Sequence, residues 1–319
     1  SKHVMAGLLT SGEDAQLAVE LATAVAGSAD EARRRPPLSL CGGAAALDAA
    51  LVFARVGLPV GVVLAPADAA AGTPGPPSAP SAAACDAVDA PPELGPTLVR
   101  HHAGVLAGCA AVQAAVPGAP FFYVADAAAA GLQPAGPQAS LFHLAAAQLA
   151  AHVRLPLVAG GLRSTSHEPD WQACQQHAFA SLSTVGSGAD VTGGAGLLGA
   201  ATAFSPQQLV MDTEIFSWNA KIAAGITVDD ETMALEAIRQ VDICGNFLGQ
   251  RHTRRHMKDV WRPRLLDRSM WDAWVASGRE GAYEKATALA EQLLAEHTAV
   301  PLGAEARGVI ERIAAGPGL

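Results

Sequence analysis

A basic, histidine-containing stretch over residues 245–268 holds the densest set of chemically capable side chains in this chain. His252 and His256 lie four positions apart, so a helix would put both on one face, at a spacing that a metal ion accepts. No third ligand is evident nearby, and the His-Glu-x-x-His arrangement of zinc enzymes is missing. We therefore expect no metal, and we assign His252, His256 and Trp261 a structural role that ties the C-terminal helices to the rest of the chain.

The same stretch contains six arginines, although the formal net charge of the chain is −9. Such a basic island can meet an acidic partner protein or a phosphate, while a solvated helix face is the simpler alternative. The acidic balance of the whole chain argues against nucleic acid and against an anionic membrane surface as partners. We assign partner binding to Arg251, Arg254 and Arg255.

Polar residues also follow several predicted strands, which is where enzymes built on parallel barrels carry their active sites. His167 is suited to a substrate carboxylate, and Glu168 or Asp170 to a cation. Simpler explanations exist, because Asp170 can cap a helix and Tyr123 can belong to the core. The full set of predicted substrate-binding residues is Tyr123, Asp126, His167, Glu168, Asp170, Gln172, Asp190 and Gly194.

Gly194 enters this set because it lies in a glycine-rich loop, Gly193–Gly196, directly after a predicted strand. The loop lacks the glycine spacing of a dinucleotide site and the lysine of a phosphate-binding loop. We expect it to allow close approach of the backbone to a bound ligand.

Short apolar runs alternate with longer segments of helical period along the first two thirds of the chain. The predicted strands are Val4–Leu9, Leu38–Cys41, Val60–Ala65, Phe121–Val124, Leu155–Ala159 and Asp190–Thr192. The predicted helices between and after them are Glu13–Ala26, Ala46–Val56, Leu98–Val116, Gln138–Val153, Asp170–Val185 and Pro206–Ala224. This alternation predicts an α/β fold with a parallel sheet covered by helices.

A closed (β/α)₈ barrel of the TIM type needs eight such units, and six are visible. Either an open sheet forms or the first strands of a barrel are missing from this sequence, and the prediction adopted is the incomplete barrel over residues 1–226. A proline- and alanine-rich loop interrupts it at 66–96. Residues 227–319 contain no strand-like run and are predicted to form an all-helical extension packed on the barrel.

Five scattered cysteines at 41, 85, 109, 174 and 244 form no Cys-x-x-Cys pair. They predict reduced thiols in a cytoplasmic protein and disfavour a cysteine zinc site. No apolar run reaches the length of about 20 residues that a membrane helix needs.

The stretches GNFLGQRHTRRH and WRPRLLDRS, with FSPQQLVMDTEIF and ITVDDETMALEAIRQV before them, resemble the C-terminal signature of the trimethylamine methyltransferase family. The resemblance implies a (β/α)₈ barrel, of which this chain is similar to roughly the C-terminal two thirds. It implies methyl transfer from a methylated amine to the Co(I) of a corrinoid (cobalamin) carried by a partner protein, with no cofactor bound covalently here. Because the chain has no pyrrolysine, it is similar to the branch that demethylates quaternary amines such as glycine betaine.

Two alternatives stay open. Gly104 stands where the family is expected to carry a glutamate, and with the loop at 66–96 it favours a degenerate, inactive barrel that serves as a binding or structural subunit. Assembly into a homo-oligomer is left open for either function. A decarboxylase or aldolase is weaker, because no lysine follows a predicted strand to form a Schiff base.

Overall fold

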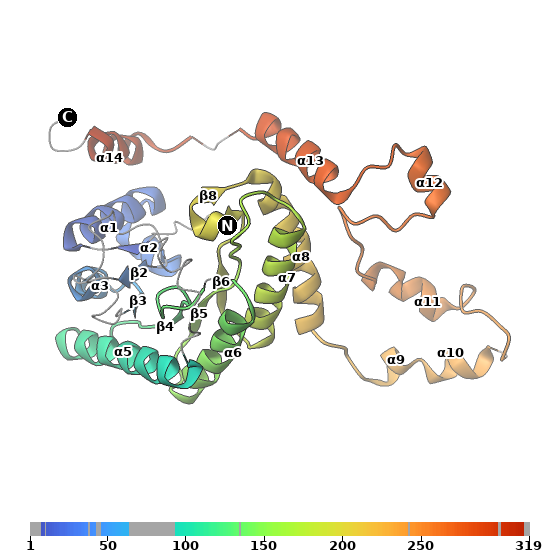
Figure 1. Ribbon diagram of the computed structural model, residues 1–319, viewed down its shortest axis with the longest axis horizontal. Helices are drawn as coiled ribbons and strands as arrows, with labels where there is room; N and C mark the ends of the chain where they lie inside the picture. The colour runs from blue at the N-terminus through green and yellow to red at the C-terminus, as the bar shows by residue number, and fades with distance from the viewer. Residues whose placement is uncertain are drawn as a thin grey trace.

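The structure is a computed structural model in which strands at the centre are surrounded by helices, and a C-terminal arm extends from this body (Figure 1). It describes residues 8–9, 11–37, 39–42, 46–63, 93–133, 135–241, 243–298 and 301–315.

Within these residues, six short parallel strands form the centre of the body. They are β1 (Leu8–Leu9), β2 (Ser39–Gly42), β3 (Val60–Val63), β4 (Tyr123–Ala125), β5 (Leu157–Gly160) and β6 (Val191–Gly193). They pair as two sheets in chain order, β1-β2-β3 and β4-β5-β6. A parallel bridge between Val60 and Phe121 joins the two sheets, with the Phe122 N–H 3.1 Å from the Val60 carbonyl oxygen.

All six predicted strands are thus confirmed as strands. Strands that lie next to each other are consecutive in the chain, as in a (β/α) barrel. Closure of this wall into a complete barrel stays a prediction. The mixed helix-and-strand class is confirmed.

The helices of the body lie around the outside of the strands (Figure 1). They are α1 (Gly12–Ala26), α2 (Ala29–Arg34), α3 (Ala46–Arg55), α5 (Leu94–Ala115), α6 (Pro137–His152), α7 (Trp171–Gly186) and α8 (Pro206–Ala223). Several begin at side-chain caps, where Ser11, Asp170 and Ser205 each accept a backbone N–H three residues on. Such a cap contributes about 1 kcal/mol by satisfying a donor that the first helical turn leaves free.

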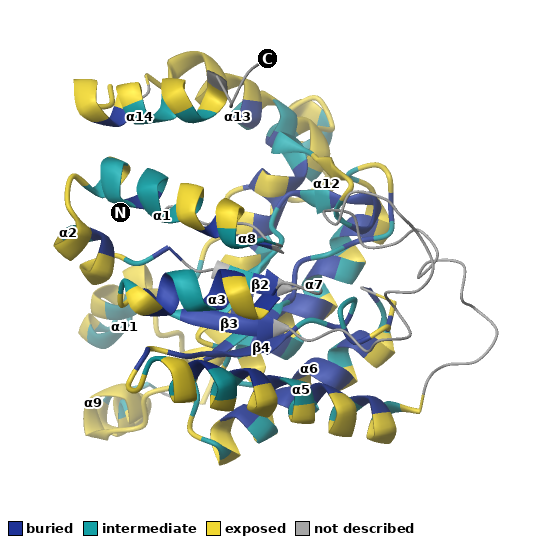
Figure 2. Ribbon diagram, turned by 90° about the vertical axis from the view of Figure 1, so that its left-hand side faces the viewer, coloured by how far each residue is buried: buried dark blue, intermediate teal, exposed yellow. Residues whose placement is uncertain are grey.

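Side chains alternate between the two faces of the sheet, and this alternation separates two apolar layers. Tyr123 and Ala125 of β4 face the main core under the helices, where Phe53 and Phe142 also lie. Phe122 and Val124 form a second cluster with Leu40 and Val158 on the other face. Figure 2 shows the strands buried between these layers.

Two features of the body did not follow from the sequence. Helix α2 is one, and the other is an antiparallel hairpin of β7 (Leu197–Leu198) and β8 (Ala203–Phe204), joined by the 3₁₀ turn Gly199–Ala201. The predicted loop at 66–96 lies outside the described residues up to residue 92, and α5 begins at Leu94.

The C-terminal region contains two kinds of helix. Its first part, from residue 226 to 280, extends away from the body in Figure 1 and carries no buried residue in α9 (Asp230–Met233), α10 (Leu235–Gln240), α11 (Arg251–His256) or α12 (Trp271–Ala276). Beyond this segment, which we call the arm, α13 (Ala282–Glu296) packs on α8 and α14 (Ala304–Ala315) on α1. Within the C-terminal region, α13 and α14 are therefore the helices that pack on the body. The predicted domain division near residue 226 stays a prediction.

The described cysteines Cys109, Cys174 and Cys244 are free thiols. Among the described residues, none of the helices combines the length and apolar character that crossing a membrane requires.

Replacing Gly61 of β3 by alanine should lower the free energy of unfolding by about 1–3 kcal/mol through overpacking. An alanine Cβ would lie 2.3 Å from Phe122 Cε2 and 2.4 Å from Val124 Cγ2. Urea unfolding measures the effect, and Gly186→Ala is the matched control, because its Cβ would meet no atom within 4 Å. Equal stability of the two variants would show that Gly61 is not a packing requirement.

Candidate active site

An ion pair joins the carboxyl ends of β4 and β5. Asp126 directly follows β4, and Arg163 lies three residues after β5. The guanidinium donates two hydrogen bonds to the carboxylate, with Arg163 Nη2 2.8 Å from Asp126 Oδ2 and Nη1 3.3 Å from Oδ1. Both side chains retain about a fifth of their surface exposed, 18% for Asp126 and 20% for Arg163. The pair is thus joined by two hydrogen bonds and remains accessible to a ligand from solvent.

Asp126 is fixed from a second direction by its own chain. Its Oδ1 accepts the backbone N–H groups of Ala128, at 2.9 Å, and of Ala129, at 3.3 Å. These bonds set the direction of the carboxylate independently of Arg163, so the acid keeps its position if a ligand displaces the guanidinium.

Two buried histidines lie behind the pair, His101 on α5 and His143 on α6. His101 Nε2 donates to the Val124 carbonyl oxygen at 2.7 Å, and burial lowers the pKa of His101. Burial also lowers the pKa of His143 to about 4, against the attraction of the Asp126 carboxylate. Both rings are therefore neutral at pH 7, and Asp126 and Arg163 supply the charges at this edge.

Tyr123 does not belong to this site, contrary to prediction. Alternation along β4 turns its side chain toward the helices, where it is fully buried. Its hydroxyl lies 3.3 Å from His102 Nδ1 on α5, and burial raises its pKa to about 12. The ring is a core residue in the layer that supports β4.

The loop between β5 and α7 and the first turn of α7 carry four predicted site residues in different roles. His167 and Glu168 are exposed on the same loop as Arg163. Asp170 caps α7: the Ala173 N–H lies 2.9 Å from its Oδ1 and, with the Ser166 hydroxyl, lowers the pKa of Asp170.

Gln172 donates to Thr165 Oγ1 at 3.0 Å and so fastens the loop to α7. Gln176 reinforces it by accepting from the Ser164 hydroxyl at 2.7 Å and from the Thr165 N–H at 3.0 Å. Gln172 therefore contacts the loop that positions Arg163, as part of its support.

Asp190 and Gly194 lie at opposite ends of β6. Asp190 precedes the strand, and its carboxylate accepts the Leu157 N–H at 2.8 Å, so it lies at the amino edge, away from Asp126. Gly194 follows the strand with φ +104°, where a Cβ would lie 2.0 Å from the Leu162 carbonyl oxygen. The close backbone approach predicted for Gly194 is therefore to the β5–α7 loop itself.

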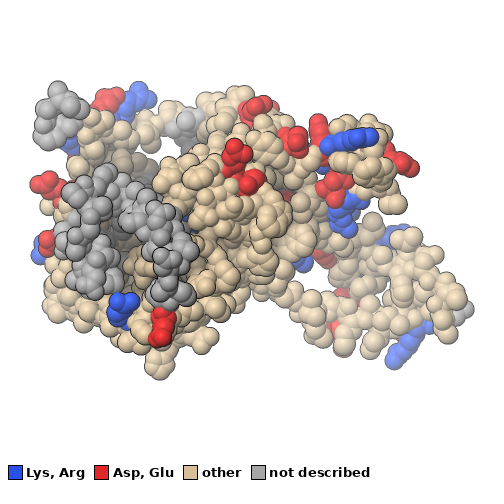
Figure 3. Space-filling model, in the orientation of Figure 1, with Lys and Arg blue, Asp and Glu red and all other residues tan. Residues whose placement is uncertain are grey.

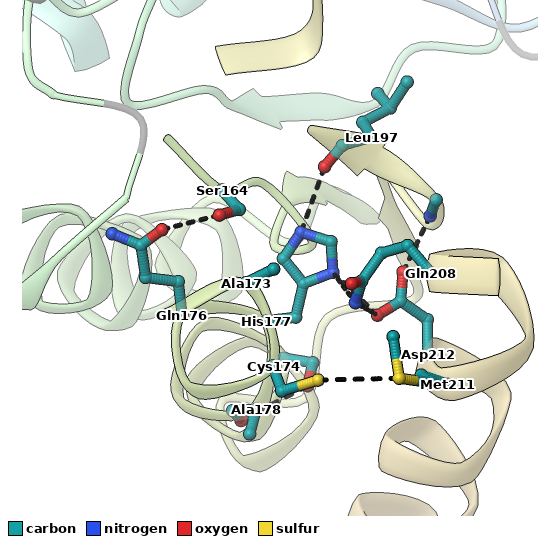
Figure 4. A network of polar contacts seen from close by, with 12 residues as sticks. Ser164, Ala173, Cys174, Gln176, His177, Ala178, Leu197, Gln208, Met211 and Asp212 are labelled. Atoms are coloured by element: carbon teal, nitrogen blue, oxygen red, sulfur yellow. Dashed lines mark hydrogen bonds and ion pairs between the residues drawn. The ribbon is translucent and has the colours of Figure 1, made fainter. Parts of the chain in front are cut away.

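A fully buried polar network holds the hairpin β7–β8 against α7 and α8 (Figure 4). His177 Nδ1 lies 2.7 Å from Asp212 Oδ1, and its Nε2 lies 3.1 Å from the Leu197 carbonyl oxygen. Asp212 also accepts the Gly196 N–H at 2.7 Å and the Gln208 amide at 2.8 Å. A carboxylate with three donors and no exposed surface is a structural anchor.

The hairpin in turn holds the β5–α7 loop. The Gly199 N–H donates to the Ser166 carbonyl oxygen and the Ala200 N–H to that of Ser164, both at 2.7 Å. The Asp212 network is thus connected through the hairpin to the loop that carries Arg163.

An apolar pocket between α7, α8 and the C-terminal residues Leu265, Leu266 and Ala282 is a second place to consider. Trp171, Phe179 and Trp218 contribute to its lining, and aromatic faces suit a quaternary ammonium. Its acid, Glu214, is already bound to the Arg264 N–H, with both oxygens 3.0–3.1 Å from the nitrogen. Because the pocket is lined by helices and not by strand ends, we do not take it as the reaction site.

The residues predicted for structure and for partner binding lie on or beside the arm. Trp261 Nε1 donates to Ser217 Oγ on α8 at 2.9 Å, which ties the arm to the body. His252 and His256 instead contact residues of the arm itself, and Arg255 contacts Glu231. Figure 3 shows Lys and Arg side chains along this arm, where Arg251 and Arg254 are also exposed.

Residues 69–313 match the family model described as trimethylamine methyltransferase (MTTB). This chain belongs to that family. The chain is 37% identical over 221 residues to the trimethylamine methyltransferase MttB of Methanosarcina barkeri (strain Fusaro / DSM 804), an alignment that covers 68% of this chain and 45% of the relative.

Two further relatives come from Desulfitobacterium hafniense. A trimethylamine methyltransferase MttB of strain DSM 10664 / DCB-2 is 30% identical over 330 residues, covering 98% of this chain and 62% of the relative. A glycine betaine methyltransferase of strain Y51 is 32% identical over 222 residues, covering 67% and 46%. The chain thus spans less than two thirds of the length of these curated members of the trimethylamine methyltransferase family.

Arg163 is the residue of the site that the sequence analysis missed. Its signal was the Gly160-Gly161-Leu162-Arg163 run directly after a predicted strand, in which a lone charge follows apolar and glycine residues. Asp126 was predicted without its partner, because the two residues are 37 positions apart.

His143 predicts a specific acid sensitivity of folding. Its folded-state pKa of about 4 lies below the unfolded value of 6.5, so the unfolded chain takes up the proton first. The stabilisation by neutral His143 is complete above pH 6.5 and is lost as pH falls toward 4, a change of roughly 3 kcal/mol. Urea unfolding of His143→Leu should show a flatter pH profile, whereas His152→Leu, at an exposed site on the same helix, should follow the wild type.

Asp212→Ala should lower the free energy of unfolding by about 3–5 kcal/mol, because it leaves His177, Gln208 and the Gly196 N–H without their shared acceptor. Thermal and urea unfolding measure this loss. Glu236→Ala, on the exposed surface of α10, should change stability by less than about 0.5 kcal/mol. A loss below about 1 kcal/mol for Asp212→Ala would show that the network is not an anchor.

Proposed function

We propose that this chain is the catalytic region of a methyltransferase that moves a methyl group from a methylated amine to the Co(I) of a corrinoid on a partner protein. Family membership supports the reaction class, and each relative named above is a methyltransferase. The observation that carries the proposal for the site is the Asp126–Arg163 pair at the carboxyl edge of β4 and β5. We infer further that the six strands belong to a (β/α)₈ wall, in which this edge faces the reaction.

The pair favours a zwitterionic substrate such as glycine betaine. A betaine carries a quaternary ammonium and a carboxylate a few bonds apart, so it can place the carboxylate on Arg163 and the ammonium beside Asp126. Arginine binds carboxylates through two parallel hydrogen bonds, which fixes orientation as well as position. Trimethylamine has no carboxylate and can therefore interact only with Asp126. We propose His167, on the same loop as Arg163, as a further contact for the carboxylate of a betaine.

The chain's residues then act by position and electrostatics. The carbon–nitrogen bond breaks as the methyl carbon leaves, the nitrogen keeps the bonding pair, and the corrinoid supplies the pair for the new bond. No proton moves in this step, which agrees with the neutral histidines behind the pair. Arg163 and Asp126 orient the substrate, and Glu168, on the same loop as Arg163, adds negative charge near the ammonium.

A corrinoid protein must reach the same edge. The partial exposure of Asp126 and Arg163 supports access from solvent. We assign Arg251, Arg254 and Arg255 of the arm to an acidic surface on that partner, because opposite charges raise the rate and specificity of association. The alternative of an inactive barrel is not favoured, because the family match spans residues 69–313 and its named relatives are methyltransferases.

Arg163→Gln should weaken binding of glycine betaine by about 10–100-fold, the loss of one charge-assisted pair of hydrogen bonds. Binding of trimethylamine should change less, because Asp126 is held by its backbone donors. Calorimetry with both ligands measures the two changes. Arg154→Gln is the matched control, since this exposed arginine precedes β5 at its amino end. Equal losses for both ligands, or no loss for betaine, would contradict the assignment.

A further inference from the structure

We propose that Glu231, His252 and His256 form a binding site for one divalent transition metal, with zinc as the ion that the ligand set fits best. The structure supplies the third ligand that the sequence did not reveal. One ligand atom from each residue lies within 4.8 Å of the others. Glu231 comes from α9 and the two histidines from one face of α11.

The hydrogen bonds of the two histidines prepare them for a metal. His256 Nδ1 lies 2.8 Å from Asp259 Oδ2, and His252 Nε2 lies 2.8 Å from the Glu231 carbonyl oxygen. A carboxylate and a carbonyl accept, so these nitrogens carry the protons and the other nitrogen of each ring keeps its lone pair. Metal-binding histidines have this arrangement, in which the second nitrogen donates to a carboxylate or to a backbone carbonyl.

The free nitrogen of His256 already faces the carboxylate. His256 Nε2 is buried without a hydrogen-bond partner among the described residues, and it lies 3.6 Å from Glu231 Oε1. The two imidazole rings lie with their centroids 4.4 Å apart. Zinc binds nitrogen and oxygen at about 2.0–2.1 Å, so these ligands need to approach by roughly 1 Å, and solvent completes a four-coordinate shell.

Arg255 is the competing cation at this site. Its guanidinium contacts Glu231 Oε1. With Asp259 and Asp229 close to His256, the surroundings favour positive charge. A zinc ion would take over Glu231 from Arg255, so the arginine and the metal compete for one carboxylate. This competition separates a metal site from a plain surface ion pair.

The metal would stabilise a part of the chain that has little core. Helices α9 and α11 contain no buried residue, so apolar packing contributes little to holding them together. A shared ion would fasten them through three ligands, and its binding energy would add to the stability of the arm.

Zinc titration of the full chain by calorimetry tests the proposal. The wild type should bind one zinc ion per chain, and Glu231→Gln and His256→Asn should each weaken binding at least 10-fold. Glu236→Gln on α10 and Cys244→Ser are matched controls on the same arm and should bind as the wild type does. Arg255→Gln should bind zinc more tightly, because it frees Glu231.

Limited proteolysis gives a second readout that does not depend on heats of binding. Zinc should protect residues 241–250, between α10 and α11, in the wild type but not in Glu231→Gln, and a chelator should reverse the protection. The proposal is overturned if wild type and Glu231→Gln bind zinc equally, if Cys244→Ser abolishes binding, or if Arg255→Gln weakens it.

Discussion

The ion pair between Asp126 and Arg163, with its two hydrogen bonds, depends on the parallel pairing of β4 with β5. Tyr123, Val124 and Ala125 pair in register with Leu157, Val158 and Ala159, so the two strands end at the same edge. The residues that follow them meet there, although 37 positions separate them in the chain. The histidines behind the pair are neutral, so they add no further charge next to Asp126 and Arg163. The substrate orientation, the preference for a zwitterion and the access by a partner that we propose all rest on this placement.

The rest of the body keeps that edge in position. The buried Asp212 holds α7, α8 and the hairpin together, and the hairpin holds the β5–α7 loop through Gly199 and Ala200. The arm is built differently, because its helices are exposed and rely on polar contacts such as those of Trp261 and Glu231. A well-packed body with a polar, weakly packed arm agrees with the proposed function, in which a second protein binds next to the substrate.

The sequence predicted the body well because its elements have strong local signals. Short apolar runs located the six described parallel strands, and the period-3.6 segments between them located the long helices. The site was predicted in part, since Asp126 was named but Arg163 was not, and Tyr123 was placed on the wrong face. A three-residue strand that is buried on both faces shows no alternation of apolar and polar residues. The direction of its side chains therefore cannot be predicted from the sequence. The hairpin was missed because two-residue strands are too short to show a sequence pattern. The proximity of Glu231 to His252 was missed because it depends on how the arm folds.

The most direct test of the central claim is a crystal structure of the chain soaked with glycine betaine. The account predicts density for betaine at the carboxyl edge of β4 and β5, with its carboxylate within hydrogen-bond distance of both terminal nitrogens of Arg163 and its ammonium beside Asp126. Betaine bound instead in the aromatic pocket between α7 and α8, with the Asp126–Arg163 pair unchanged, would contradict it.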